Sequence, residues 1–300
     1  MKRFEHEHIF AFKLNSARIF ENSKIFDLVK DLKKTFDLDD IESKARYRFA
    51  LASKKKIGLK LFLMGLIESL KLRRIETKAF NFFDNILICS STDQKELKKR
   101  HRQGNFYIIP NVVDEVNALT IEENTTQTRL LFVGTMQYGP NNEAAIHFVK
   151  NVFPIISTLS SKKFILDIVG YHPSEEILSF AKDPSIFVHG GVSSVKSYYQ
   201  QADIVIAPIL TGGGTRIKIL EAIMFGRPVI STTIGAEGLD LVNKKEILLA
   251  DNPINFAQVI IELSENKAMA NDINIHAIIK LEKLYTQKAL FELYKTLFQK

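Results

Sequence analysis

Short apolar runs recur along the second half of the chain and alternate with longer stretches of helical periodicity. Runs such as 130–133 (LLFV) and 204–207 (IVIA) are continuously apolar, which is typical of parallel strands covered by helices on both faces. Six such runs predict strands at 129–134, 164–170, 186–189, 203–208, 228–231 and 246–250. The alternation therefore predicts a complete, Rossmann-like, doubly wound α/β domain over 129–285. Ligands of such sheets bind beyond the carboxyl ends of the strands.

The first 115 residues show the pattern of a partial domain of the same class. Strand candidates lie at 8–12, 35–38, 85–90 and 106–110, and a long basic helical stretch occupies 44–83. The polar segment 120–128 (TIEENTTQT) is typical of a linker. We therefore expect a partial N-terminal domain at 1–115, a linker at 116–128, the complete domain at 129–285, and a C-terminal helix at 286–300 that packs back toward the N-terminal domain.

Charge is distributed unevenly between these two parts. The chain has 300 residues, 46% of them hydrophobic and 25% charged, which excludes disorder and fits one or two globular domains. Residues 1–110 hold 24 basic and 14 acidic side chains, a net charge of +10, whereas the remainder sums to −3. The first part is therefore expected to meet an anionic partner.

The stretch 54–78 concentrates this charge, with eight basic and two acidic residues among Leu, Ile, Phe and Met. Such a composition suits a helix lying on an anionic bilayer, and equally a core-facing helix with a solvated basic side. Stacking aromatics do not alternate with the cations, which argues against a nucleic-acid partner. The single cysteine, Cys89, allows no disulfide framework and indicates a reducing compartment, the cytoplasm. If the stretch 54–78 lies on an anionic bilayer, we expect the protein on the inner membrane face.

A glycine-rich segment gives the sharpest chemical signal. Gly212, Gly213 and Gly214 follow a strand and lead into a helix that Thr215 can cap and Gly226 can close. Unpaired amides and the helix dipole favour an anion at such a site. The next cations, Arg216 and Lys218, lie where the dipole disfavours positive charge unless an anion compensates. The segment therefore predicts a bound phosphate.

Glu221 lies in the middle of this otherwise apolar helix, where a buried carboxylate needs a partner. It could accept hydrogen bonds from two sugar hydroxyls, as a ribose presents them. Alternatively, it forms an i, i+3 pair with Lys218, which contributes only about 0.2–0.5 kcal/mol.

Three aspartates cluster after the second strand candidate: Asp37, Asp39 and Asp40. Strand alternation places Asp37 and Asp39 on one face and Asp40 on the other. One of them could orient an acceptor hydroxyl or act as its base. The alternative is that Asp39 or Asp40 caps the next helix.

These motifs, taken in order, resemble a known family. FVGTMQYGPNNEAAIHF, DIVG, HGGVSSVKSYYQQADIVIAPI, GGGTRIKILEAIMFGRPVIST and GAEGL resemble the donor-binding domain of GT-B glycosyltransferases of family 4, the glycosyl transferases group 1. Upstream, ICSSTDQKELKKR with IIPNVVD resembles the end of that family's first domain, and FDLDDIES its acceptor-facing segment.

The resemblance implies a hexosyltransferase of cell-surface polysaccharide synthesis, with a nucleotide-diphosphate sugar as donor, a glycan or lipid-linked acceptor, and no metal cofactor. It implies that Glu221 binds the ribose, that the glycine-rich loop surrounds the diphosphate, and that Arg216 and Lys218 stabilise the leaving group. The implied donor-binding residues are Gly134, Gly191, Val192, Gly213, Gly214, Thr215, Arg216, Lys218 and Glu221, and the implied catalytic residues are Asp39, Asp40, Arg216 and Lys218.

Three departures from the family pattern qualify this expectation. Gly213 stands where the family often has a first glutamate, and Thr135 with Pro140 and Asn141 occupies the places of an Arg and a Lys that commonly hold the diphosphate. The N-terminal domain is also shorter than the family's, and we expect an open sheet edge there. A non-catalytic protein that binds a nucleotide sugar or acts as a scaffold is therefore the alternative.

Overall fold

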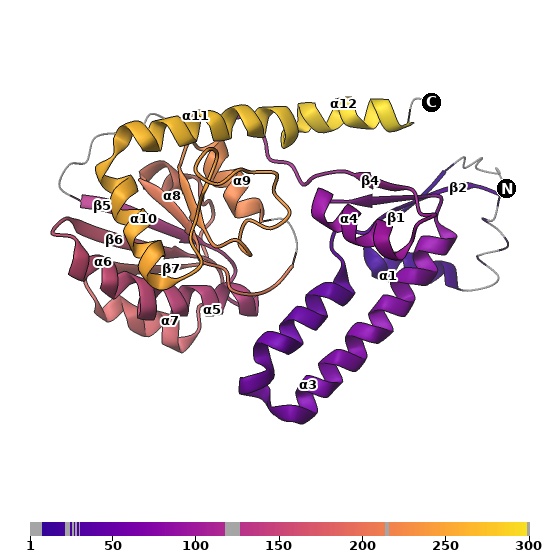
Figure 1. Cartoon of the computed structure of the whole chain (residues 1–300), viewed down its shortest axis with the longest axis horizontal. Helices are drawn as coiled ribbons and strands as arrows, with labels where there is room; N and C mark the ends of the chain where they lie inside the picture. The colour runs from indigo at the N-terminus through magenta and orange to yellow at the C-terminus, as the bar shows by residue number, and fades with distance from the viewer. Residues whose placement is uncertain are drawn as a thin grey trace. The chain divides into compact units, whose positions relative to one another are not determined.

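The computed structural model describes residues 8–21, 25, 27, 29, 31–117, 127–213 and 216–298. The chain forms two compact units (Figure 1). Unit 1 comprises Met1–Pro110 with Thr211–Thr215, and unit 2 comprises Asn111–Leu210 with Arg216–Lys300. Most of the expected linker, residues 118–126, lies outside the described residues, as do Gly214 and Thr215.

Unit 1 is a four-stranded parallel sheet with helices, as the sequence predicts. Its elements are β1 (His8–Phe12), α1 (Lys13–Ala17), η1 (Arg18–Glu21), β2 (Lys33–Asp37), α3 (Glu42–Phe82), β3 (Asn85–Ile88), α4 (Ser91–Arg100) and β4 (Phe106–Ile108). The strand order is β1-β2-β3-β4. One buried row crosses all four strands: Ala11, Phe36, Ile86 and Phe106. Within the described residues β1 pairs only with β2, and Phe10 and Phe12 are half exposed there.

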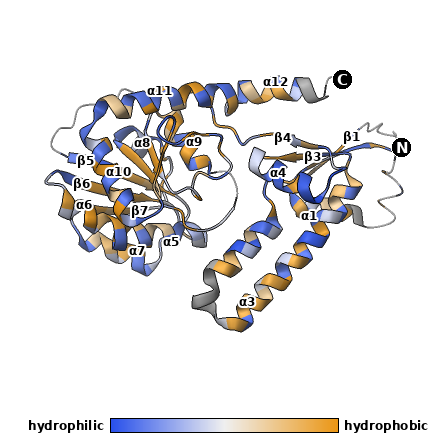
Figure 2. Ribbon diagram, viewed as in Figure 1, coloured by the Kyte–Doolittle hydropathy of each residue, from blue (hydrophilic) through white to orange (hydrophobic). Residues whose placement is uncertain are grey.

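Helix α3 differs from the single helix that the basic stretch predicts. Its backbone leaves helical geometry at Gly58, where φ is 75° and ψ is 165°. Glycine tolerates this left-handed φ, and the chain folds back on itself into two arms (Figure 1). The arms pack closely, because a Cβ on Gly65 would lie 2.8 Å from the Cβ of Ala50. Hydrophobic residues recur along both arms (Figure 2), and several of them are exposed.

Unit 2 contains the expected doubly wound α/β domain. Its elements are β5 (Gln127–Val133), α5 (Gly139–His147), η2 (Phe148–Val152), α6 (Phe153–Leu159), β6 (Lys163–Val169), α7 (Glu175–Ser179), η3 (Phe180–Lys182), β7 (Ile186–Gly190), α8 (Lys196–Gln201), β8 (Ile204–Ala207), α9 (Ile217–Met224), β9 (Val229–Ser231), β10 (Leu248–Leu249), α10 (Pro253–Glu265), α11 (Lys267–Leu284) and α12 (Gln287–Phe298). The parallel sheet has the order β10-β9-β8-β5-β6-β7. All six predicted strands are confirmed.

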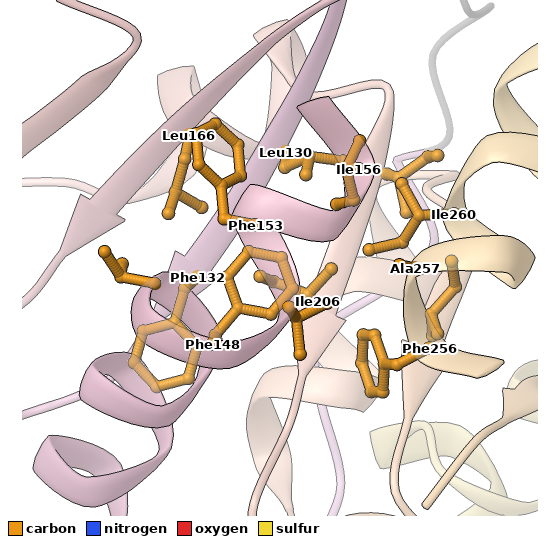
Figure 3. Packing of buried hydrophobic residues seen from close by; sticks show 14 of the residues in the cluster. Leu130, Phe132, Phe148, Phe153, Ile156, Leu166, Ile206, Phe256, Ala257 and Ile260 are labelled. Atoms are coloured by element: carbon orange, nitrogen blue, oxygen red, sulfur yellow. The ribbon is translucent and has the colours of Figure 1, made fainter. Parts of the chain in front are cut away.

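The two faces of this sheet carry separate cores. Leu130 and Phe132 point to the face covered by α5, η2, α6 and α10, whose side chains close around them (Figure 3). Leu131 and Val133 point to the opposite face, which α8, α9 and α11 cover. Alternate residues of one strand are therefore buried on both sides, which is why the strands read as unbroken apolar runs.

Candidate functional site

The carboxyl end of β5 is a point where the sheet changes direction. From β5 the chain builds outward to β6 and β7, and it then returns to place β8 on the other side of β5. At such a switch point the loops after the two neighbouring strands diverge and leave room for a ligand. Here those loops are the segment after Val133, which begins with Gly134, and the segment that follows Ala207, the last residue of β8.

Helix α9 begins one residue later than the sequence predicts. Its N-cap position is Arg216, which makes no side-chain cap, so Lys218 is the second helical residue. At the other end Gly226 has a φ of 70°. The amides of Gly226 and Arg227 donate to the carbonyls of Ile223 and Ala222. This pattern confirms that Gly226 closes the helix.

Lys218 joins the two helical layers across the edge of the sheet. α9 covers one face and α5 the other, yet Lys218 Nζ donates to Asn141 Oδ1 of α5 at 2.8 Å. The ammonium also lies 4.7 Å from the centre of the Phe132 ring. Asn141 Nδ2 in turn donates to the carbonyl of Thr135, at 3.0 Å. The cation is thereby fixed beside the end of β5.

Gly134 leaves room for this arrangement. A Cβ at this position would lie 2.8 Å from both Lys218 Nζ and Asn141 Nδ2, closer than nonbonded atoms pack. Burial of the ammonium, assisted by the charge of Arg216 and opposed by Glu221, lowers the pKa of Lys218 to about 7. A nearby anion would favour the charged form of this lysine.

Glu221 has a partner that the sequence reasoning did not identify. The hydroxyl of Tyr199 donates to Glu221 Oε2 at 2.9 Å and also lies 3.3 Å from the carbonyl of Lys218. Tyr199 is fully buried and stacks on Phe225, with ring centres 5.2 Å apart. Burial, and then the charge of Glu221, raises the pKa of Tyr199. Lys218 thus hydrogen-bonds to Asn141, and Glu221 to Tyr199. The Glu221 carboxylate is oriented by Tyr199 and not by an ion pair with Lys218.

Gly191 and Val192 follow the carboxyl end of β7. A Cβ on Gly191 would lie 2.4 Å from the Tyr171 ring, and the Tyr171 hydroxyl is 3.4 Å from the carbonyl of Val192. The half-exposed ring of Tyr171 therefore borders the backbone that we expect to face the nucleobase. The sequence reasoning did not select Tyr171.

The buried carboxylate of Asp167, in β6, contacts His189 near the end of β7. Asp167 is 2% exposed and accepts from Arg129 Nη1 at 2.7 Å. His189 Nε2 lies 2.6 Å from the other oxygen of Asp167, and the imidazole packs against the Tyr198 ring at 4.7 Å. Arg129 and His189 thus engage both oxygens of the carboxylate, and they fix the strand that leads to Gly191.

The aspartates of unit 1 lie at the carboxyl end of β2, which ends at Asp37. The backbone then turns, with Asp39 at a φ of 61° and its amide donating to Asp37 Oδ1 at 3.2 Å. Lys13 Nζ is 3.3 Å from Asp39 Oδ2. Burial is the main cause that raises the pKa of Asp37. The N-cap of α3 is Ile41, without a side-chain cap, so the capping alternative for Asp39 and Asp40 is wrong.

Cys89 lies beside this cluster, buried and donating from Sγ to Asp39 Oδ1 at 3.4 Å. Burial and the neighbouring carboxylates raise the pKa of the thiol, so it remains protonated and is no nucleophile. Among the described residues no group of three His, Cys, Asp or Glu side chains could hold a metal ion. The described helices also include none that is long and apolar enough to cross a membrane.

The structure thus brings together some of the predicted residues and not others. Gly134, Arg216, Lys218 and Glu221 gather around the switch point of unit 2, with Asn141 and Tyr199 as partners. Gly213 groups with unit 1, where Asp39 and Asp40 also lie. Gly214 and Thr215 lie outside the described residues.

Comparison with known proteins supports the fold and the domain type. Residues 127–266 match the family model described as "Glycosyl transferases group 1". An uncharacterized 44.6 kDa protein in the cps region of Klebsiella pneumoniae is 27% identical over 171 residues, which are 54% of this chain and 44% of that protein.

Solved structures cover nearly the whole chain at low sequence identity. TarM of S. aureus matches with a TM-score of 0.73 at 14% identity, over 98% of this chain and 55% of TarM. Sucrose-phosphate synthase of Thermosynechococcus elongatus matches with 0.69 at 15% identity, over 98% and 74%. Anabaena Alr3699/HepE in complex with UDP-glucose matches with 0.66 at 13% identity, over 98% and 79%.

The chain spans 44% of the length of the curated relative and 55% of TarM. The expected fold is confirmed, since the neighbours are GT-B glycosyltransferases and both sheets described here are parallel. The protein therefore has the GT-B fold of these structures, and its residues 127–266 are similar to the glycosyl transferases group 1.

Proposed function

We propose that unit 2 binds a nucleotide-diphosphate sugar at the carboxyl end of β5 and that the protein transfers the hexose to a glycan or lipid-linked acceptor. The observation that carries this proposal is the Lys218 ammonium, which is held by Asn141 beside Gly134 at the start of α9. A diphosphate at this point would meet the ammonium and the positive end of the α9 dipole together.

Electrostatics favour an anion at this place. Lys218 lies in the first turn of α9, where the positive end of the dipole repels a cation by about 0.3–1 kcal/mol. Arg216 adds a second cation and contributes to the lowered pKa of Lys218. A bound diphosphate would attract both cations and the positive end of the dipole, and would so offset these repulsions. These two cations replace the Arg and Lys that the family resemblance leads us to expect after β5.

Glu221 lies one helical turn beyond Lys218, which suits a ribose next to the diphosphate. Its carboxylate is oriented by Tyr199, which engages only Oε2. The remaining lone pairs of the carboxylate can accept from ribose hydroxyls. Gly191 and Val192, beside the Tyr171 ring, are the proposed place of the nucleobase.

The proposed transfer breaks the bond between the anomeric carbon and the diphosphate oxygen and forms one to an acceptor oxygen. Lys218, Arg216 and the helix amides stabilise the charge that develops on the leaving diphosphate, so that no metal ion is needed. Asp39 or Asp40 takes the proton of the acceptor hydroxyl. Asp39 forms an ion pair with Lys13, whose Nζ lies 3.3 Å from Asp39 Oδ2.

The acceptor is proposed by analogy with the matched proteins. The relative from a cps region supports a place in polysaccharide synthesis, and one TarM structure holds UDP with alpha-GlcNAc-glycerol. We place the protein in the cytoplasm, with the basic stretch 54–78 against the anionic inner face of the membrane, where lipid-linked acceptors would lie.

Calorimetry with UDP, GDP and ADP in EDTA tests donor binding. We expect one of them to bind with a Kd below about 1 mM, a free energy stronger than about −4 kcal/mol. If none does, the phosphate site is wrong. Release of the nucleoside diphosphate from its sugar in the presence of acceptor then separates transfer from the alternative, binding without catalysis.

A further inference from the structure

Helix α3 carries an unpartnered apolar face on its second arm, which runs from Gly58 to Phe82. Four side chains at spacings of four, four and three residues form this face: Leu59, Leu63, Ile67 and Leu70. Their exposed fractions are 67%, 47%, 52% and 58%. We call these four residues the apolar stripe. At 1.5 Å per residue the stripe is about 16 Å long, too short to span a bilayer but long enough to lie along one.

The apolar stripe is not needed to pack the second arm, because the opposite side of that arm already packs against the first arm. Gly65 touches Ala50 of the first arm, and Ser69 Oγ donates to the carbonyl of Ser43 at 2.8 Å. The amide of Ser43 donates to the buried carboxylate of Glu76, also at 2.8 Å. The arm is therefore held by its inner side, and helical periodicity places the exposed stripe on the other side of the arm.

Cations border the stripe. Lys60 and Lys71 lie along one side of it and Arg73 along the other, and all three are exposed. The acid on this part of the arm, Glu68, is paired with Arg46 of the first arm. An apolar stripe between cations is the arrangement of helices that lie in the interface of an anionic bilayer, with the aliphatic side chains toward the acyl chains and the ammonium groups among the headgroups.

We infer that the second arm of α3 docks on an anionic lipid bilayer through the apolar stripe. Charge favours this occupant over a second copy of the chain, which would bring the same cations into opposition. The inference deepens the membrane contact of the proposed function by naming the inserted face. It needs neither donor binding nor transfer, so each can fail without the other.

The sequence contains no tryptophan, which allows a direct insertion assay on the full chain. Leu63→Trp places the sole indole in the stripe, and Ile279→Trp places one at another exposed site, on α11. With vesicles of equal phosphatidylcholine and phosphatidylglycerol, we expect the first indole to shift to shorter wavelength and to be quenched by brominated acyl chains. The second indole should show neither effect. Equal response of the two, or no response of either, overturns the inference.

Sedimentation with the same vesicles measures the partition coefficient of the protein, and so the contributions of the apolar stripe and of the cations to binding. Leu63→Gln, Ile67→Gln and Leu70→Gln together should reduce the partition coefficient at least tenfold, whereas Ile254→Gln, Ile275→Gln and Ile279→Gln, at matched exposure, should leave it unchanged. Lys60→Glu with Lys71→Glu should reduce it at least 25-fold, about fivefold per cation removed. Lys182→Glu with Lys196→Glu is the control for net charge.

A control for folding and two further measurements decide whether a bilayer or a second copy of the chain covers the apolar stripe. Circular dichroism and nucleoside diphosphate binding by the stripe variant should match those of the original chain, because its substitutions are exposed. If light scattering shows a dimer that the stripe variant converts to a monomer, while vesicle binding is unchanged, a second copy occupies the stripe and the inference is wrong. Equal binding to pure phosphatidylcholine, insensitive to salt, also contradicts it.

Discussion

Raising the pH above 7 should weaken the binding of a nucleotide-diphosphate sugar, because Lys218 loses its charge. Its ammonium is enclosed by Asn141, the Phe132 ring and the backbone at Gly134, and this burial lowers its pKa to about 7. A diphosphate beside Nζ would stabilise the charged form and raise the pKa again. Above pH 7 the free protein therefore holds fewer protons than the complex, and binding takes up a proton.

The size of the effect follows from the pKa. With a pKa of about 7, only about one Lys218 in eleven is charged at pH 8 in the free protein, and about one in thirty at pH 8.5. Affinity should therefore be constant below about pH 6.5 and fall about tenfold, or about 1.4 kcal/mol, per pH unit well above 7. The fall ends where the pKa of the bound form is reached.

Calorimetry with UDP-glucose, GDP-mannose and ADP-glucose from pH 6 to 8.5 measures this slope, since the diphosphate of a nucleotide sugar has no group that titrates in this range. Repetition in buffers of different ionisation enthalpy counts the protons taken up. Lys218→Met should bind weakly at every pH and show no slope, whereas Lys196→Met, an exposed lysine of α8, should retain the slope.

A flat profile in the original chain, with no proton uptake at pH 8, would refute the assignment of Lys218 to the diphosphate. The same slope for the nucleoside alone would refute it too, because a nucleoside presents no phosphate charge.

Three other substitutions test separate parts of the account. Glu221→Gln keeps the shape but removes the charge, and should weaken nucleoside binding by about 1–3 kcal/mol; unchanged calorimetric affinity for uridine, guanosine and adenosine would remove the ribose role. Gly134→Ala places a Cβ 2.8 Å from Lys218 Nζ. It should abolish diphosphate binding, while the thermal midpoint of unfolding stays within a few degrees. An unchanged affinity for the diphosphate would show that the space beside Gly134 does not serve phosphate binding. Phe148→Ala removes a fully buried ring of η2 that packs against Phe256 of α10. It should reduce the free energy of unfolding, measured by urea titration, by about 3–5 kcal/mol. A loss below about 1 kcal/mol would contradict the packing described.

The strands were predictable because burial on both faces leaves a local signature. Residues 130–133 supply both cores of unit 2, so every position in the run is apolar. The break in α3 was not predictable in the same way, because apolar periodicity continues through Gly58 and a glycine in a helical pattern is compatible with either outcome. Contacts between the arms, such as the approach of Gly65 to Ala50, stabilise the folded-back chain, and they join residues far apart in the sequence.

The candidate site was predictable in type but not in its connections. The glycines and cations before α9 identify an anion site from local sequence alone, and Glu221 stands out as a carboxylate in an apolar helix. Its partner Tyr199 is 22 positions away, and Asn141 is 77 positions from Lys218. Contacts across the sheet edge depend on strand order, which no local pattern encodes. The capping alternative for Asp39 failed because the backbone turns into a left-handed conformation at that residue.

The most direct test of the central claim compares Lys218→Ala on paired ligands. Affinities of the original and variant proteins for UDP and uridine, and for the GDP and ADP pairs, are measured by calorimetry in EDTA, with the fold checked by circular dichroism. The account predicts that Lys218→Ala weakens the nucleoside diphosphate at least tenfold and leaves the nucleoside nearly unchanged, because Nζ meets only phosphate. An equal loss for both ligands in the folded variant would show that Lys218 supports the structure and does not bind the diphosphate.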